Sequence, residues 1–264
     1  QHAYVRRQRQ MCIRDSDMEL HKKLLNQINK SVFYINYYFQ GEPFLHPRFL
    51  DLIKEAKRSR IYTSTSSNVH FISPKKALEI VDSGLDRLII SIDGLTQKTY
   101  EQYRVNGKLS RVLQASQYLV EAKKERGSAT PHLIFQFLAV KPNEHEIPKV
   151  FELASEMSID EVRIKTAQLY VFENGNPLMP DNQQYSRYTK QKDGSYKLKG
   201  NPGNHCWRMW SSHWNRYEWA RLPPLGSKLP RPHTQHHRWD QRVRLRTGHR
   251  PGTDSLPIGS HRAP

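Results

Sequence analysis

Apolar residues follow two alternating spacings between residues 17 and 166. Leu20, Leu24, Leu25 and Ile28 recur at helical intervals, so the body of the chain is expected to start with an amphipathic helix. Residues 32–39 are instead β-branched and aromatic, which is typical of a strand. The pattern then repeats, with helices predicted near 47–57, 73–84, 112–120 and 147–154 and strands at 61–65, 88–92, 132–140 and 162–165. This alternation favours a parallel α/β domain, either doubly wound or barrel-like.

Two details of the pattern sharpen this prediction. Leu88-Ile89-Ile90-Ser91-Ile92 is almost continuously apolar, as in a strand of a parallel sheet covered on both faces. Ser73-Pro74 is typical of a helix start, with Ser73 as the cap and Pro74 as the first helical residue. A βα series that opens on a helix indicates that one strand is missing upstream.

Four of the five predicted strands end in polar residues, and the chemistry of α/β folds is found at the carboxyl ends of strands. The segments that follow four of the five strands are Gln40-Gly41-Glu42-Pro43, Ser66-Ser67-Asn68, Ser91-Ile92-Asp93-Gly94 and Lys165-Thr166. In a parallel sheet these segments fall on one edge, where they predict a ligand-binding rim. No glycine-rich dinucleotide fingerprint, Walker loop, H-E-x-x-H pair or C-x-x-C pair occurs in the chain.

The formal net charge of +17 over 264 residues suggests an anionic partner, but its distribution weakens that suggestion. Ten of the seventeen excess positive charges lie in residues 1–16 and 213–264. The tail from 213 is rich in Arg, Pro and His and lacks any apolar period, which is typical of a disordered segment or of translation in a wrong frame. The head contains Met11-Cys12-Ile13-Arg14-Asp15-Ser16, which resembles a translated sequencing adapter. No stretch is long and apolar enough to predict a membrane span or a secretory signal, so a cytoplasmic protein is expected.

The segment around Gly41-Glu42-Pro43 resembles the G-E-P segment that follows the second strand of radical S-adenosylmethionine (radical SAM) enzymes. Residues 88–94, with the Thr99-Tyr100 and Tyr103-Arg104 pairs after them, are similar to the fourth strand and following loop of that family. Residues 206–212, Cys-Trp-Arg-Met-Trp-Ser-Ser, resemble the opening of its C-terminal SPASM extension, which holds auxiliary iron–sulfur clusters. The resemblance covers residues 17–212.

This resemblance implies a partial (β/α)6 TIM-like barrel that lacks its first strand, followed by a linker and a remnant of a SPASM domain. Together with the composition of the two ends, it divides the chain into a non-native or disordered head at 1–16, the barrel at 17–166, a linker at 167–205, the start of the SPASM domain at 206–212 and the basic tail at 213–264. It also implies an enzyme that binds a [4Fe–4S] cluster and S-adenosylmethionine and generates a 5′-deoxyadenosyl radical for hydrogen abstraction from a substrate. A peptide or small-molecule substrate and an electron donor are the partners implied.

The resemblance also implies site residues. Gly41 and Glu42, stiffened by Pro43, would accept hydrogen bonds from the ligand ammonium. Ser64 would contact the ribose of the ligand. Ser91 would contact either the ribose or the carboxylate of the ligand. Arg104 would pair with the ligand carboxylate. Each has a structural alternative: a tight turn at 41–43, small packed serines, and a solvated surface arginine.

The cysteines depart from the family pattern. Three cysteines in C-x-x-x-C-x-x-C would hold the cluster, whereas this chain has only Cys12 and Cys206, and Cys206 matches an auxiliary-cluster ligand. The expectation is therefore an inactive chain, truncated upstream and frameshifted after Ser212, with no catalytic residue assigned. A non-catalytic barrel that serves as a binding module is the first alternative, and nucleic-acid binding through the Arg-rich tail is the second, less favoured one.

Overall fold

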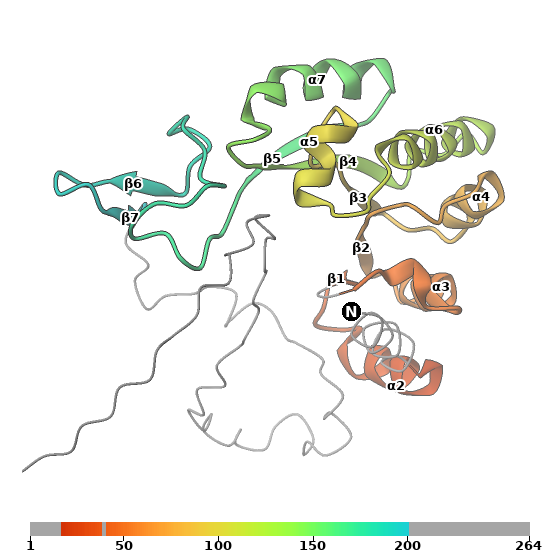
Figure 1. Cartoon of the computed structure of the whole chain (residues 1–264). Coiled ribbons are helices and arrows are strands. Elements are labelled where there is room, and N and C mark those ends of the chain that lie inside the picture. The colour runs from red at the N-terminus through yellow and green to blue at the C-terminus, as the bar shows by residue number, and fades with distance from the viewer. Residues whose placement is uncertain (1–16, 39–40, 201–264) are drawn as a thin grey trace, which may run out of the picture. The chain divides into compact units, whose positions relative to one another are not determined.

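Five parallel strands form one sheet in a computed structural model that describes residues 17–38 and 41–200. The strands lie in sequence order, each paired with the next (Figure 1). They are β1 (Tyr34–Asn36), β2 (Tyr62–Ser67), β3 (Arg87–Ser91), β4 (His132–Ala139) and β5 (Glu161–Thr166). The predicted α/β class with a parallel sheet is confirmed.

Helices connect the strands, as the helical spacing predicted. The α-helices are α2 (Met18–Ile28), α3 (Phe49–Arg58), α4 (Pro74–Asp82), α5 (Gln97–Tyr103), α6 (Leu109–Glu125) and α7 (Ile147–Glu156), and two short 3₁₀ helices are η1 (Pro43–Leu45) and η2 (Glu144–Glu146). Ser73 caps α4 by accepting a hydrogen bond from the amide of Lys76, as predicted from Ser73-Pro74. One expectation was wrong. The resemblance placed Thr99-Tyr100 and Tyr103-Arg104 in a loop, but Thr99, Tyr100 and Tyr103 lie in helix α5, because Thr96 and Thr99 make a reciprocal capping box.

The strand order decides between the two α/β architectures left open by the residue pattern. A doubly wound sheet reverses its strand order at a switch point, whereas this order runs from β1 to β5 without reversal. The helices also pack on one face of the sheet, because alternate residues of β3 and β4 share a single core with α3, α4, α6 and α7 (Figure 1). The sheet is therefore wound as in a barrel.

Strand β2 is made almost wholly of serine and threonine, yet three of its hydroxyl-bearing residues on the helix-facing side are buried. Each of those hydroxyls finds a partner. Thr63 Oγ1 donates to Asp86, Thr65 Oγ1 donates to the carbonyl of Tyr37, and Ser67 Oγ donates to Glu42. Buried hydroxyls of this kind cost little once they are hydrogen-bonded, so a polar strand can lie inside the sheet.

Residues 167–200 contain more structure than the predicted linker implies. Strands β6 (Tyr188–Lys190) and β7 (Tyr196–Leu198) form an antiparallel hairpin. A second apolar cluster joins this region to the end of β4, with Val140, Ala167, Leu169, Met179 and Tyr188 at its centre. Tyr188 also fastens the hairpin to this cluster, because its hydroxyl accepts from the amide of Leu169 and donates to the carbonyl of the same residue. The domain boundaries themselves stay a prediction.

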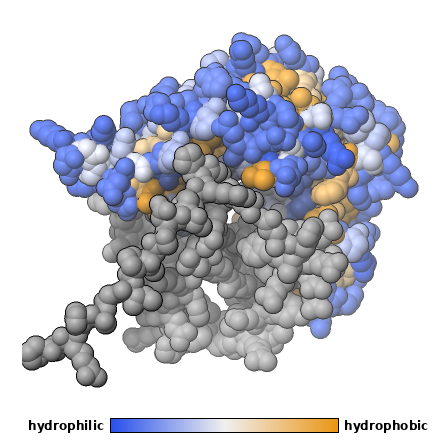
Figure 2. All heavy atoms as spheres, in the orientation of Figure 1, coloured by the Kyte–Doolittle hydropathy of each residue, from blue (hydrophilic) through white to orange (hydrophobic). Residues whose placement is uncertain are grey.

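The described surface is mostly hydrophilic on the face shown in Figure 2, with scattered apolar patches. Among the residues that the structure describes, no helix is long and apolar enough to cross a membrane. The predictions for the head at 1–16, the SPASM start at 206–212 and the tail at 213–264 lie outside the described residues.

Candidate functional site at the carboxyl edge of the sheet

The polar segments after the strands lie on one edge of the sheet, because all five strands are parallel. Two of these segments touch directly. Glu42, after β1, accepts hydrogen bonds from Ser67 Oγ at 2.8 Å and from the amide of Asn68 at 2.9 Å, both at the end of β2. The segment after β1 is thereby fastened to the neighbouring strand.

The Glu42 carboxylate is 8% exposed and its hydrogen bonds are internal. Besides its two β2 partners it accepts from the amide of Phe44 at 3.3 Å and so caps η1. Burial raises the pKa of this carboxyl, and the three hydrogen bonds and the nearby charge of Arg104 oppose that rise. Glu42 therefore holds the turn in place, and its charge is coupled to that of Arg104.

Gly41 and Pro43 shape the same turn. Gly41 has φ 87°, in the left-handed region that favours glycine, and Pro43 is the first residue of η1. The turn expected as the structural alternative is present. It presents the main chain of Gly41 at the strand edge, where the absence of a side chain allows close approach by a ligand.

A buried ion pair lies after β3. Arg104 Nε donates to Asp93 Oδ2 at 2.5 Å, and the other carboxylate oxygen accepts from the amide of Leu138 at 3.0 Å. Asp93 is 2% exposed and the Arg104 side chain 34% exposed. Burial alone would lower the pKa of Arg104, but Asp93 raises it above its ordinary value. The solvated arginine considered as an alternative is therefore a half-buried, ion-paired one.

Asp93 does not cap the helix that follows it. Thr96 caps α5, while Asp93 accepts hydrogen bonds from Arg104 and from the amide of Leu138. The neighbouring glycine permits this path, because a Cβ on Gly94 would lie 2.4 Å from the amide nitrogen of Tyr100. Helix α5 thus packs directly on the end of β3.

Tyr100 leaves a polar atom unpaired beside the ion pair. Its hydroxyl is buried and has no hydrogen-bond partner among the described residues. Burial raises the pKa of Tyr100 to about 12, and the charges of Arg104 and Asp93 act on it as well. A buried donor without a partner costs free energy, so the Asp93–Arg104 corner is one at which a polar ligand would be favoured.

The two predicted serines lie at different depths. Ser91 ends β3 on the side opposite the helix-packed Leu88 and Ile90, and no hydrogen bond to its side chain occurs within the described part of the chain. Ser64 lies earlier in its strand, in register with Arg87, and accepts a hydrogen bond from Arg87 Nε at 2.9 Å. Ser91 is thus at the edge with Asp93, whereas Ser64 is not among the residues that contact Glu42.

Two supporting residues were missed by the sequence analysis. Asn143 is 1% exposed, receives a hydrogen bond from the amide of Val140 and donates to the carbonyls of Asp93 and Leu138. Glu146 accepts from the amide of Leu95 and from the hydroxyl of Thr99. Both residues tie the loop after β4 to the segment that carries Asp93 and α5.

Metal ligands are a different matter. Within residues 17–38 and 41–200, no group of three or more His, Cys, Asp or Glu side chains could hold a metal ion. Neither of the two cysteines is in these ranges, and Cys206, predicted to ligate an auxiliary cluster, lies outside the described residues. Two cysteines in the whole chain do not supply the three thiolates of a [4Fe–4S] site, so the residues present do not fit that cluster.

The fold and site together define a parallel, barrel-wound α/β protein with a polar carboxyl edge. The Radical SAM superfamily model matches residues 12–154, more than half of the sequence, and the chain belongs to this superfamily. The family uses S-adenosylmethionine and a [4Fe–4S] cluster.

Individual relatives are distant. The tungsten-containing aldehyde ferredoxin oxidoreductase cofactor-modifying protein of Pyrococcus furiosus is 24% identical over 171 residues, which cover 63% of this chain and 48% of that protein. PqqA peptide cyclase of Gluconobacter oxydans is 28% identical over 155 residues, covering 57% of this chain and 41% of that enzyme. The chain therefore spans about half the length, or less, of these relatives.

A solved structure has the same fold. Streptococcus suis SuiB bound to S-adenosylmethionine matches with a TM-score of 0.51 and 15% identity, over 60% of this chain and 35% of SuiB. At this level of identity the match shows the fold of the sheet and its helices. The α/β partial-barrel prediction is therefore confirmed, while the predicted SPASM remnant is not shown.

Proposed function

We propose that this chain is the barrel of a radical SAM enzyme and binds S-adenosylmethionine at the carboxyl edge of its sheet. The predicted ligand contacts are Gly41, Glu42, Pro43, Ser64, Ser91 and Arg104. The observation that carries the proposal is the Asp93–Arg104 ion pair, within electrostatic reach of Glu42 and of the Tyr100 hydroxyl, which has no hydrogen-bond partner among the described residues.

The residues at this edge suit the amino-acid end of the ligand. Asp93 engages Nε of Arg104, and the guanidinium makes no other hydrogen bond within the described residues, so its remaining N–H groups are available to a carboxylate. The turn at Gly41 offers main-chain acceptors to an ammonium, and Ser91 offers a hydroxyl to ribose or carboxylate. In this family, S-adenosylmethionine would supply the radical that abstracts hydrogen from the substrate after an electron from the cluster had cleaved it.

Binding of S-adenosylmethionine by the full chain tests this proposal. Arg104→Lys keeps a positive charge for Asp93 but removes the planar fork, so we expect affinity to fall about tenfold. Isothermal titration calorimetry measures the change, and thermal melting followed by circular dichroism confirms that the variant is folded. Arg111→Lys, at an exposed position of α6, is the matched control and leaves affinity unchanged. A chain that binds no S-adenosylmethionine, or equal affinity in both variants, would contradict the proposal.

The chain as printed is proposed to be inactive, because it has two cysteines where the cluster motif needs three. After anaerobic reconstitution with iron and sulfide, we expect no iron–sulfur absorbance. Roughly four irons per chain, the content of one cubane cluster, would refute this. A barrel that binds its ligand without radical chemistry is the second candidate function, and the same cysteine count favours it.

The partners are proposed at the level of class. A peptide or small-molecule substrate and an electron donor fit the enzyme proposal, and one relative is by name a peptide cyclase. Nucleic acid is the less favoured partner, because the excess positive charge is concentrated in the head and tail. A cytoplasmic location stays a prediction from the sequence.

A further inference from the structure

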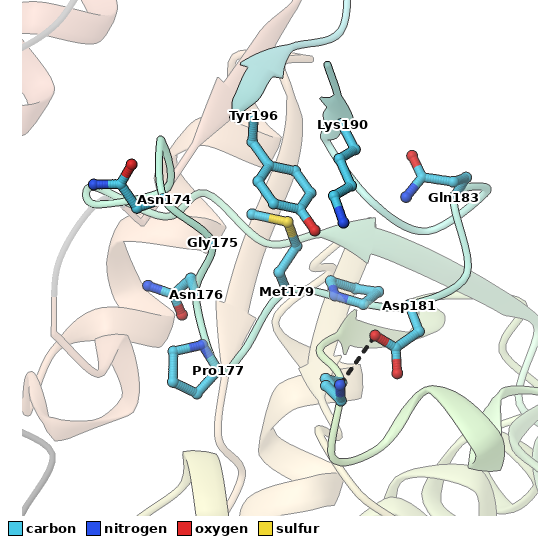
Figure 3. Close-up of a pocket in the computed structure, with 11 residues that line it drawn as sticks. Asn174, Gly175, Asn176, Pro177, Met179, Asp181, Gln183, Lys190 and Tyr196 are labelled. Carbon is cyan, nitrogen blue, oxygen red and sulfur yellow. Dashed lines mark hydrogen bonds and ion pairs between the residues drawn. The ribbon is translucent and has the colours of Figure 1, made fainter. Parts of the chain in front are cut away.

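A pocket separate from the carboxyl-edge site lies between the loop after β4 and the β6–β7 hairpin. Its volume is about 560 Å³, within the range of ligand pockets. Lys141 contributes from the loop after β4, residues 174–183 form one wall, and Lys190 and Tyr196 line it from the hairpin (Figure 3).

The hairpin sets two polar side chains next to each other. Lys190 and Tyr196 are directly opposite in the antiparallel register, so both project from the same face of β6 and β7. Figure 3 shows the ammonium of Lys190 and the hydroxyl of Tyr196 beside each other in the pocket, next to the Met179 side chain. Within the described ranges, neither group has a hydrogen-bond partner.

Of the two lysines that line the pocket, one has an acidic partner and the other, Lys190, has none among the described residues. Lys141 Nζ is paired with Asp181 Oδ1 at 3.0 Å, which neutralises the first lysine. No carboxylate lies within 4.0 Å of Lys190 in the described part of the chain. The ammonium of the exposed Lys190 and the hydroxyl of the half-buried Tyr196 therefore lie in a mixed lining. Asn176 and Gln183 are among its polar members, and Pro177, Pro180 and the buried Met179 are its apolar ones.

We propose that this pocket binds a carboxylate group, held by Nζ of Lys190 and Oη of Tyr196, from an acidic side chain of a peptide. A carboxylate accepts from both donors at once, and the rings of Pro177 and Pro180 in the same lining would contact the side-chain methylenes. This inference rests on the proposed function for the identification of the peptide as a substrate. The pocket is connected to the carboxyl-edge site through β4, because Leu138 of that strand contacts Asp93 and Lys141 follows the same strand.

Methyl NMR of the full chain tests the pocket directly. The probe is the peptide acetyl-Gly-Glu-Gly-amide, and the reporter is the ¹³C-labelled methyl group of Met179, assigned with Met179→Leu. We expect a saturable shift with the glutamate peptide. The isosteric glutamine peptide should bind about tenfold more weakly, because it lacks the charge that Lys190 recognises.

Two variants and one control locate the binding groups. Lys190→Met should weaken binding of the glutamate peptide about tenfold, and Tyr196→Phe about threefold. Lys197→Met is the matched control, because Lys197 pairs with Thr189 and projects from the opposite face of the hairpin, and it should leave affinity unchanged.

An unshifted Met179 signal, equal affinity for the two peptides, or an equal loss in the Lys190 and Lys197 variants would each overturn the pocket proposal. Unchanged signals of the other methionines in the variants show that the fold is intact. The readout is independent of S-adenosylmethionine, so peptide binding without S-adenosylmethionine binding would sink the proposed function and leave the pocket standing.

Discussion

Replacement of Asn143 by alanine is expected to destabilise the barrel more than its small size suggests. The side chain makes hydrogen bonds of 2.8 Å with the amide of Val140 and of 2.9 Å with the carbonyls of Asp93 and Leu138. All are buried or partly buried, so Asn143→Ala leaves three main-chain groups without their partner. At about 1 kcal/mol for each hydrogen bond, the free energy of unfolding should fall by about 3 kcal/mol.

Urea unfolding followed by circular dichroism measures this loss. With a slope of about 2 kcal/mol per molar urea, the midpoint should fall by about 1.5 M. Asn26→Ala, at an exposed position of α2, is the matched control and should shift it little. A change below about 0.5 kcal/mol in Asn143→Ala would show that water replaces the side chain, and would refute the view that Asn143 fastens the β4 loop to the end of β3.

Three further outcomes are expected. Burial lowers the pKa of His21 from 6.5 to about 4. As the pH drops from 6.5 towards 4, the imidazole is therefore protonated in the unfolded chain before it is protonated in the folded one, and the free energy of unfolding falls. Urea titrations at several pH values should find that His21→Gln removes about 2–3 kcal/mol of that pH dependence. Asp86→Ala should cost about 2–4 kcal/mol in urea unfolding at neutral pH, because Asp86 accepts from both the amide and the hydroxyl of Thr63. Gly94→Ala should lower the melting temperature, since its Cβ would lie 2.4 Å from the amide nitrogen of Tyr100; an unchanged melt would contradict the close packing of α5.

The order of helices and strands could be predicted because most elements carry an apolar period. Helix α5 could not, because of its seven residues only Tyr100 is buried, which leaves no apolar stripe. The β6–β7 hairpin had a usable signal in Asp193-Gly194, flanked by tyrosines, which the linker interpretation passed over. Strand β1 is shorter than the predicted strand at 32–39. Phe33 lies before its first residue and is exposed, although its residue type favours a strand.

The candidate site could be predicted only as far as topology determines it. Parallel strands bring their carboxyl ends to one edge whatever the side chains do, so the segments after the strands could be located. Their partners could not, because Asp93 with Arg104, Glu146 with Thr99 and Asn143 with Asp93 are 11, 47 and 50 residues apart. Contacts at such separations depend on the packed fold and leave no local spacing in the sequence.

The contacts of Glu42 change what the turn after β1 can offer a ligand. The sequence suggested that Glu42 would accept hydrogen bonds from an ammonium, yet its carboxylate already receives three, from Phe44, Ser67 and Asn68. A carboxylate has about four lone-pair sites, so little directional capacity is left. We infer that Glu42 acts on a bound ammonium through its charge and by fixing the turn, while the direct acceptors are main-chain carbonyls around Gly41, where the positive φ and the missing side chain permit close approach.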